Sequence, residues 1–155
     1  MKTFEELLEG LSQNNIDYIL VGGLAVDICG FSRATMDVDI IVEHSKENIQ
    51  KLLNCLKLFG EGSARELHPE DFSLEEGCIR IVEEFPLDVF TLMRGYTYQN
   101  LLPHSAILIT ERGVNIRYLN VEGLIKLKEG SMRSKDQLDV QELKKQAVLH
   151  YNEVP

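Results

Sequence analysis

Residues 19–43 read ILVGGLAVDICGFSRATMDVDIIVE, and this stretch decides the fold class. A first apolar segment ends at Gly22-Gly23, and a second one, residues 36–42, carries Asp37 and Asp39. Short apolar runs bounded by glycine are typical of buried strands, so we expect two strands joined by a short helix. Buried carboxylates are costly unless something compensates their charge. The sequence therefore raises the question of what compensates these two aspartates.

The rest of the chain continues this alternation of helical and strand patterns. Helices are expected from Phe4 to Leu11, over 22–29, from Ser45 to Leu56, from Asn120 to Lys128 and from about Lys135 to Tyr151. Strands are expected over 16–21, 36–42, 78–82, 87–90, 107–110 and 114–119, and residues 64–75 fit neither pattern. The sequence contains no repeat and no linker. We therefore expect one α/β domain over residues 1–155.

The amino-acid composition narrows the classes of molecule that the protein can bind. The formal net charge is −9, from 25 acidic and 16 basic residues, which argues against nonspecific binding to a nucleic-acid backbone. No apolar run has the length of a membrane span, and the first residues lack the apolar core of a signal peptide. Cys29, Cys55 and Cys78 are widely spaced among apolar residues and predict reduced core cysteines. The expected location is the cytoplasm.

Asp37 and Asp39 lie two positions apart in a predicted strand, so their side chains project from the same face, about 6.5–7 Å apart along the chain. Two carboxylates on one face repel each other, so one takes up a proton or both bind a cation. Mg²⁺ is the usual solution, because it prefers oxygen ligands and often bridges to phosphate. The alternative is that both aspartates face solvent. Acidic residues two positions apart also arise readily by chance in so acidic a chain, so the spacing alone does not specify a metal site.

Asp88 repeats this setting in a later predicted strand, Pro86-Leu87-Asp88-Val89-Phe90. Three acids on two neighbouring strands are enough to hold the pair of metal ions used for in-line phosphoryl displacement. Alternatively, Asp88 only caps a strand end or a turn. Gly22 and Gly23 fit the same picture, because glycines between a strand and a helix let backbone amides approach phosphate. A tight strand-to-helix turn also favours glycine.

Together these motifs resemble the polymerase-beta-like nucleotidyltransferase superfamily. The blocks that carry the resemblance are Gly22-Gly23-x-Ala25, Gly30, Arg33-x-Thr35-x-Asp37-x-Asp39, Asp88, Glu122-x-Leu124-Ile125-x-Leu127-Lys128 and Arg133-x-Lys135-Asp136-x-x-Asp139. Within the superfamily they look like the small bacterial AbiEii-type proteins of abortive-infection and toxin–antitoxin systems. The second glycine stands where many relatives have serine. The further helical domain by which larger relatives recognise the acceptor is not visible.

The resemblance assigns a role to each acid. Asp37 and Asp39 would ligate two Mg²⁺ (or Mn²⁺) ions. Asp88 would ligate the catalytic ion and orient or deprotonate the acceptor. The implied reaction transfers a nucleoside monophosphate from an NTP to an acceptor hydroxyl and releases pyrophosphate.

The resemblance also assigns the phosphate contacts. Gly22 and Gly23 would cradle the nucleotide phosphates, and Lys128, Arg133 and Arg33 would meet the triphosphate or pyrophosphate. For each cation the alternative is a solvated surface charge, and Lys135, Asp136 and Asp139 alternatively cap and pair within the last helix.

The implied fold is the minimal nucleotidyltransferase core, a short mixed β-sheet with helices packed mainly on one side. The implied partners are an NTP, an unidentified acceptor (a small molecule, a tRNA or a protein) and an antitoxin or second copy of the chain. Two other functions stay open. One is an inactive nucleotidyltransferase-like subunit that binds nucleotide or a partner, and the other is a metal-dependent phosphohydrolase or nuclease.

Overall fold

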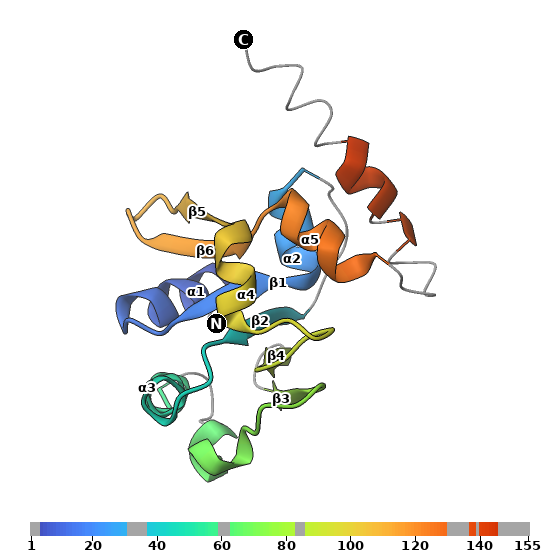
Figure 1. Cartoon of the computed structure of the whole chain (residues 1–155). Coiled ribbons are helices and arrows are strands. Elements are labelled where there is room, and N and C mark those ends of the chain that lie inside the picture. The colour runs from blue at the N-terminus through green and yellow to red at the C-terminus, as the bar shows by residue number, and fades with distance from the viewer. Residues whose placement is uncertain are drawn as a thin grey trace.

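The protein is built around one six-stranded mixed sheet, seen in the computed structural model of Figure 1. The structure describes residues 4–30, 37–58, 63–82, 86–129, 137–138 and 140–145. The strands are β1 (Tyr18–Val21), β2 (Val38–Val42), β3 (Cys78–Val82), β4 (Pro86–Phe90), β5 (Ser105–Ile109) and β6 (Asn115–Leu119). Their order across the sheet is β3-β4-β2-β1-β6-β5.

Strand direction alternates in a way that places distant segments side by side. The pairs β1–β6 and β2–β4 are parallel. The pairs β1–β2, β3–β4 and β5–β6 are antiparallel. As a result, β2 lies between β1 and β4 in the middle of the sheet, although about 45 residues separate it from β4 in the sequence. The predicted mixed α/β fold is confirmed.

Helices pack on this sheet and on one another. They are α1 (Phe4–Gln13), α2 (Gly22–Ile28), α3 (Lys46–Leu56), α4 (Tyr98–Leu101) and α5 (Val121–Lys128), with 3-10 turns at Ser63–Glu66, Pro69–Asp71 and Leu102–His104. α1 contacts α3, and α2 contacts both α5 and the two central strands. Ser45 begins α3 and Asn120 begins α5, because each side-chain oxygen accepts a bond from a first-turn amide. None of the described helices is long and apolar enough to cross a membrane.

The central strands are buried on both faces. All four residues of β1 are buried, and in β2 only Asp39 retains partial exposure. Leu7, Leu8 and Leu11 of α1 complete one part of the core. A carboxylate on β2 is therefore set in apolar surroundings, where its ionised form is disfavoured.

Two elements differ from their predictions. The strand expected over 107–110 is β5, which begins at Ser105 and ends before Thr110. The hydroxyl of Thr110 donates to Oε2 of the buried Glu9 (2.7 Å), and its amide donates to the Val114 carbonyl across a turn. α4 was not predicted, since four residues are too short to show a helical period.

The cysteines and the last helix were also predicted from the sequence. Cys55 is buried, but Cys78 is exposed because β3 lies at the edge of the sheet, so the prediction of a core cysteine there is wrong. The predicted last helix lies partly outside the described residues. Residues 137–138 and 140–145 are helical.

Candidate functional site

The sheet register brings two of the predicted acids into direct opposition. In the parallel pair β2–β4, Asp39 lies opposite Asp88. Residues that face each other across adjacent strands project from the same face of the sheet, so the two carboxylates lie side by side. Asp37 immediately precedes β2, two positions from Asp39. Three acids predicted from sequence spacing thus meet at one place on the sheet.

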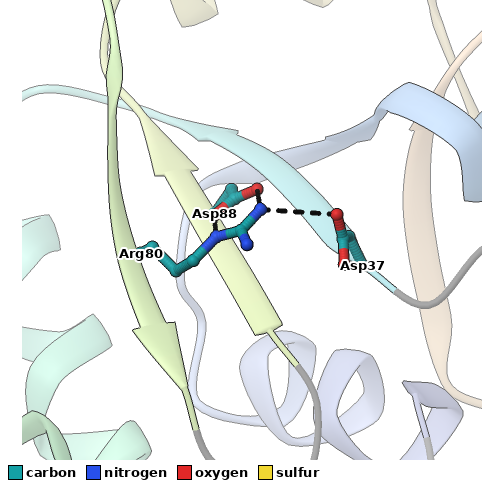
Figure 2. Close-up of polar contacts among 3 residues, drawn as sticks. All are labelled: Asp37, Arg80 and Asp88. Atoms are coloured by element: carbon teal, nitrogen blue, oxygen red, sulfur yellow. Dashed lines mark hydrogen bonds and ion pairs between the residues drawn. The ribbon is translucent and has the colours of Figure 1, made fainter.

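The side chain that meets these acids is Arg80, which the sequence analysis did not single out. Arg80 lies opposite Asp88 in the antiparallel pair β3–β4. Its Nε donates to Asp88 Oδ1 at 2.8 Å and its terminal NH2 nitrogen donates to Asp88 Oδ2 at 2.9 Å. The same terminal nitrogen reaches Asp37 Oδ2 at 3.4 Å, so the guanidinium spans two carboxylates (Figure 2). An arginine therefore compensates part of the negative charge of these acids.

A signal for Arg80 was present in the sequence. Arg80 is the only charged residue in the predicted strand 78–82, and Asp88 is the only one in the predicted strand 87–90. Arg80 and Asp88 each lie four positions from Glu84, so an antiparallel hairpin centred there pairs them. The hairpin register therefore predicts the contact between Arg80 and Asp88.

The pKa values of Asp39 and Asp88 are shifted in opposite directions. Burial, followed by the neighbouring charge of Asp88, raises the pKa of Asp39 from 3.8 to about 7. The bidentate hydrogen bonds from Arg80 instead lower the pKa of Asp88, despite its burial. The guanidinium therefore stabilises the Asp88 charge, whereas the surroundings of Asp39 still disfavour its negative charge.

The backbone conformation at position 22 and the nearby Asp39 carboxylate both require glycine there. Its φ of +71° lies in the left-handed region that favours glycine. A Cβ built on Gly22 would lie 2.1 Å from Asp39 Oδ2 and 2.9 Å from Asp39 Cγ. Any side chain at this position would therefore push the Asp39 carboxylate out of its place. The glycine that follows β1 is needed both for the turn and for the close approach of Asp39.

The remaining predicted nucleotide-binding residues lie on α2 and α5 or outside the described part of the chain. Gly23 follows Gly22 in α2. Lys128 is the last residue of α5, the helix that packs on α2. Arg33 and Arg133 lie outside the described residues.

The donor set fits a divalent cation in its chemistry. Carboxylate oxygens are the ligands that Mg²⁺ prefers, and burial together with the neighbouring charge of Asp88 raises the pKa of Asp39. Within the described residues, however, no group of three His, Cys, Asp or Glu side chains is arranged to hold a metal ion. Arg80 holds Asp88 and Asp37 through its own hydrogen bonds. The acids are collected at one place, and the oxygens of Asp37 and Asp88 face a guanidinium.

Comparison with known proteins identifies the family to which this chain belongs. The family model described as "Nucleotidyltransferase of unknown function (DUF6036)" matches residues 1–154. The chain is therefore a member of this nucleotidyltransferase family. A search of curated proteins gave no match.

Solved structures of nucleotidyltransferases share the fold. One is a protein assigned to the nucleotidyltransferases, TM1012 from Thermotoga maritima, with a TM-score of 0.53 at 16% identity, covering 95% of this chain and 88% of that one. Another is the lincosamide antibiotic adenylyltransferase LnuA in a lincomycin-bound form, with a TM-score of 0.58 at 19% identity, covering 92% of this chain and 96% of that one. At these identities the likeness establishes the nucleotidyltransferase-like fold. The predicted nucleotidyltransferase family and the predicted fold class are thereby confirmed.

Proposed function

We propose that the protein transfers a nucleoside monophosphate from an NTP to a hydroxyl group of an acceptor. The acceptor oxygen forms a bond to the α-phosphorus, the bond between that phosphorus and the α–β bridging oxygen breaks, and pyrophosphate leaves. The hydroxyl proton passes to a base at the site. Such transfers are accelerated mainly by positioning and by neutralisation of developing charge.

The observation that carries this proposal is the register that sets Asp39 opposite Asp88, with Asp37 two positions before Asp39. Packing alone gives no reason to place three acids on one face around the middle of a sheet. Asp39 is also kept close to Gly22, where any side chain would displace its carboxylate. These are features of a site built to hold carboxylate oxygens at fixed positions.

Each acid has a part in the proposed reaction. Asp37 and Asp39 would hold two Mg²⁺ or Mn²⁺ ions together, and Asp88 would hold the catalytic one. When bound, such ions supply charge neutralisation on the phosphates and on the attacking oxygen. Asp88 would orient the acceptor hydroxyl or accept its proton, and its position opposite Asp39 suits that role.

The nucleotide phosphates would contact a second set of groups. We assign them to the amides of Gly22 and Gly23, with Lys128, Arg33 and Arg133 as the cations. This set rests on the sequence resemblance, and the position of the two glycines directly after β1 agrees with it.

The acceptor is left open between a small molecule, a tRNA and a protein. LnuA, whose chain is covered to 96%, has the same fold and binds lincomycin. The likeness to LnuA therefore supports a small molecule as one candidate acceptor. The resemblance to AbiEii-type proteins stays a proposal, as does a toxin–antitoxin partner.

One observation favours a second candidate, an inactive nucleotidyltransferase-like subunit that binds nucleotide or a partner. Arg80 already satisfies Asp88 and also contacts Asp37, and a permanent ion pair of this kind would leave no room for catalysis. An active enzyme must be able to open this ion pair, whereas a binding subunit has no need to open it.

The experiment that tests the proposal uses each α-labelled NTP with Mg²⁺ and cell lysate. We expect one class of molecule to become labelled and pyrophosphate to be released in equal amount. Asp39→Asn is the control, and we expect it to abolish both signals. Nucleotide binding without labelling or pyrophosphate release would favour the inactive subunit. Hydrolysis of the NTP without a labelled acceptor would favour a phosphohydrolase.

A further inference from the structure

We propose that Arg80 is the internal counter-cation of the site: it occupies Asp88 and Asp37 in the nucleotide-free protein and yields them when a metal–nucleotide complex binds. The inference rests on the proposed function. Arg80 lies on β3, belongs to none of the motifs that resemble the superfamily, and is a positioning residue in this scheme.

Arg80 already holds carboxylate oxygens at this site. The guanidinium donates to both oxygens of Asp88 and reaches one oxygen of Asp37, so it takes the oxygens that a metal ion would use. A planar fork of donors matches a carboxylate in this bidentate way, and the charge strengthens each bond. As long as these bonds hold, the Asp88 oxygens are directed at Arg80.

The Asp88 and Arg80 side chains differ in their burial. The Asp88 side chain is only 8% exposed, so its charge needs a cation at all times. The Arg80 side chain is 51% exposed and lies on the edge strand, so it can leave toward solvent without disturbing the core. The arrangement pairs a fixed buried anion with a removable cation. Arg80 and a metal ion are then alternative partners of the same carboxylate.

This competition makes metal binding depend on the nucleotide. A free ion must lose water and also displace a guanidinium from two carboxylates. An ion that arrives with a triphosphate already has phosphate oxygens in its shell, which lowers the first cost. The protein would therefore remain nearly metal-free without nucleotide, although it gathers three acids at one place.

The test measures Mn²⁺ binding to the full chain by calorimetry, first without nucleotide and then with each NTP. We expect Arg80→Gln to bind free Mn²⁺ at least about tenfold more tightly than the wild type. Arg80→Lys keeps the charge but lacks the fork, so its affinity should fall between the two. A purely structural role for Arg80 predicts weaker binding in these variants.

Lys51→Gln is the matched control, because it removes one positive charge from an exposed i,i+4 pair with Glu47 on α3. Its affinity for free Mn²⁺ should equal that of the wild type. Circular dichroism checks folding, and if Arg80→Gln does not fold, Arg80→Lys decides by the same comparison.

The outcomes separate the two proposals. If the Arg80 variants bind free Mn²⁺ no more tightly than the wild type, while all bind Mn–NTP, the counter-cation role is refuted and the proposed function stands. If no variant binds Mn²⁺ with any NTP, the proposed function fails and the counter-cation role fails with it.

Discussion

Gly22→Ala is the substitution for which the structure gives the most direct expectation. The new methyl group would lie 2.1 Å from Asp39 Oδ2 and 3.0 Å from Asp39 Cβ. β2 cannot retreat, because it is paired on both sides with β1 and β4. The Asp39 carboxylate must therefore rotate away from its place opposite Asp88. We expect a loss of stability together with a loss of any activity that uses Asp39.

The magnitude has two parts. A left-handed backbone at a residue with a Cβ costs about 1–2 kcal/mol. Forcing an extra methyl group into an occupied space costs about 1–3 kcal/mol more. Gly113→Ala isolates the first part, because Gly113 has a φ of +79° and nothing within 4 Å of the built Cβ. The difference between the two variants should therefore be about 1–3 kcal/mol, with Gly22→Ala the less stable.

Urea denaturation at one pH, without metal, gives the free energy of unfolding of each variant. A double-mutant cycle with Asp39→Ala then tests the cause, since that change removes the two atoms nearest to the new methyl group. Gly22→Ala should cost about 1–3 kcal/mol less in the Asp39→Ala background than in the wild type. Equal costs for Gly22→Ala in both backgrounds would refute the steric argument.

Further predictions concern the acids. Asp88→Asn should leave Mg–NTP binding within about tenfold (~1.4 kcal/mol) but lower transfer at least about a hundredfold, because it keeps the shape and removes the proton acceptor. Asp37→Asn or Asp39→Asn should damage both binding and transfer; nucleotide titration beside a labelled-transfer assay checks all three, and wild-type transfer by Asp88→Asn would contradict the assigned role. The pKa of Asp39 is raised from 3.8 to about 7, so the folded state holds a proton there that the unfolded state has lost. Wild-type stability should therefore fall relative to Asp39→Asn as the pH rises from about 4 to about 7, measured by urea denaturation with a chelator; a constant difference would contradict it.

Much of the fold was predictable because local sequence patterns specify it. The strands around Ile19 and Ile40 follow from short apolar runs, and the helix after Ser45 follows from a cap and an apolar stripe. α4 and the exact ends of β5 were missed, because a four-residue helix has no measurable period and strand ends are set by pairing with β6. Local signals do not specify either feature.

The candidate acids were predicted from spacing, but their mutual position was not. Nothing in the sequence requires β2 and β4 to pair in parallel with Asp39 opposite Asp88, since a shift of one residue would send one side chain to the other face. Arg80 was missed for a related reason. Its role depends on the β3–β4 register, although the hairpin symmetry about position 84 offered a clue.

Local sequence patterns specify which segments become strands and helices, and they set Asp37, Asp39 and Asp88 within or directly beside buried strands. The tertiary structure decided which charges share a face, how deeply each is buried and that a guanidinium already compensates two of the three acids. Secondary structure follows from periodicity over a few residues. The energy of a charge depends on neighbours tens of residues away, and only the folded sheet brings them together.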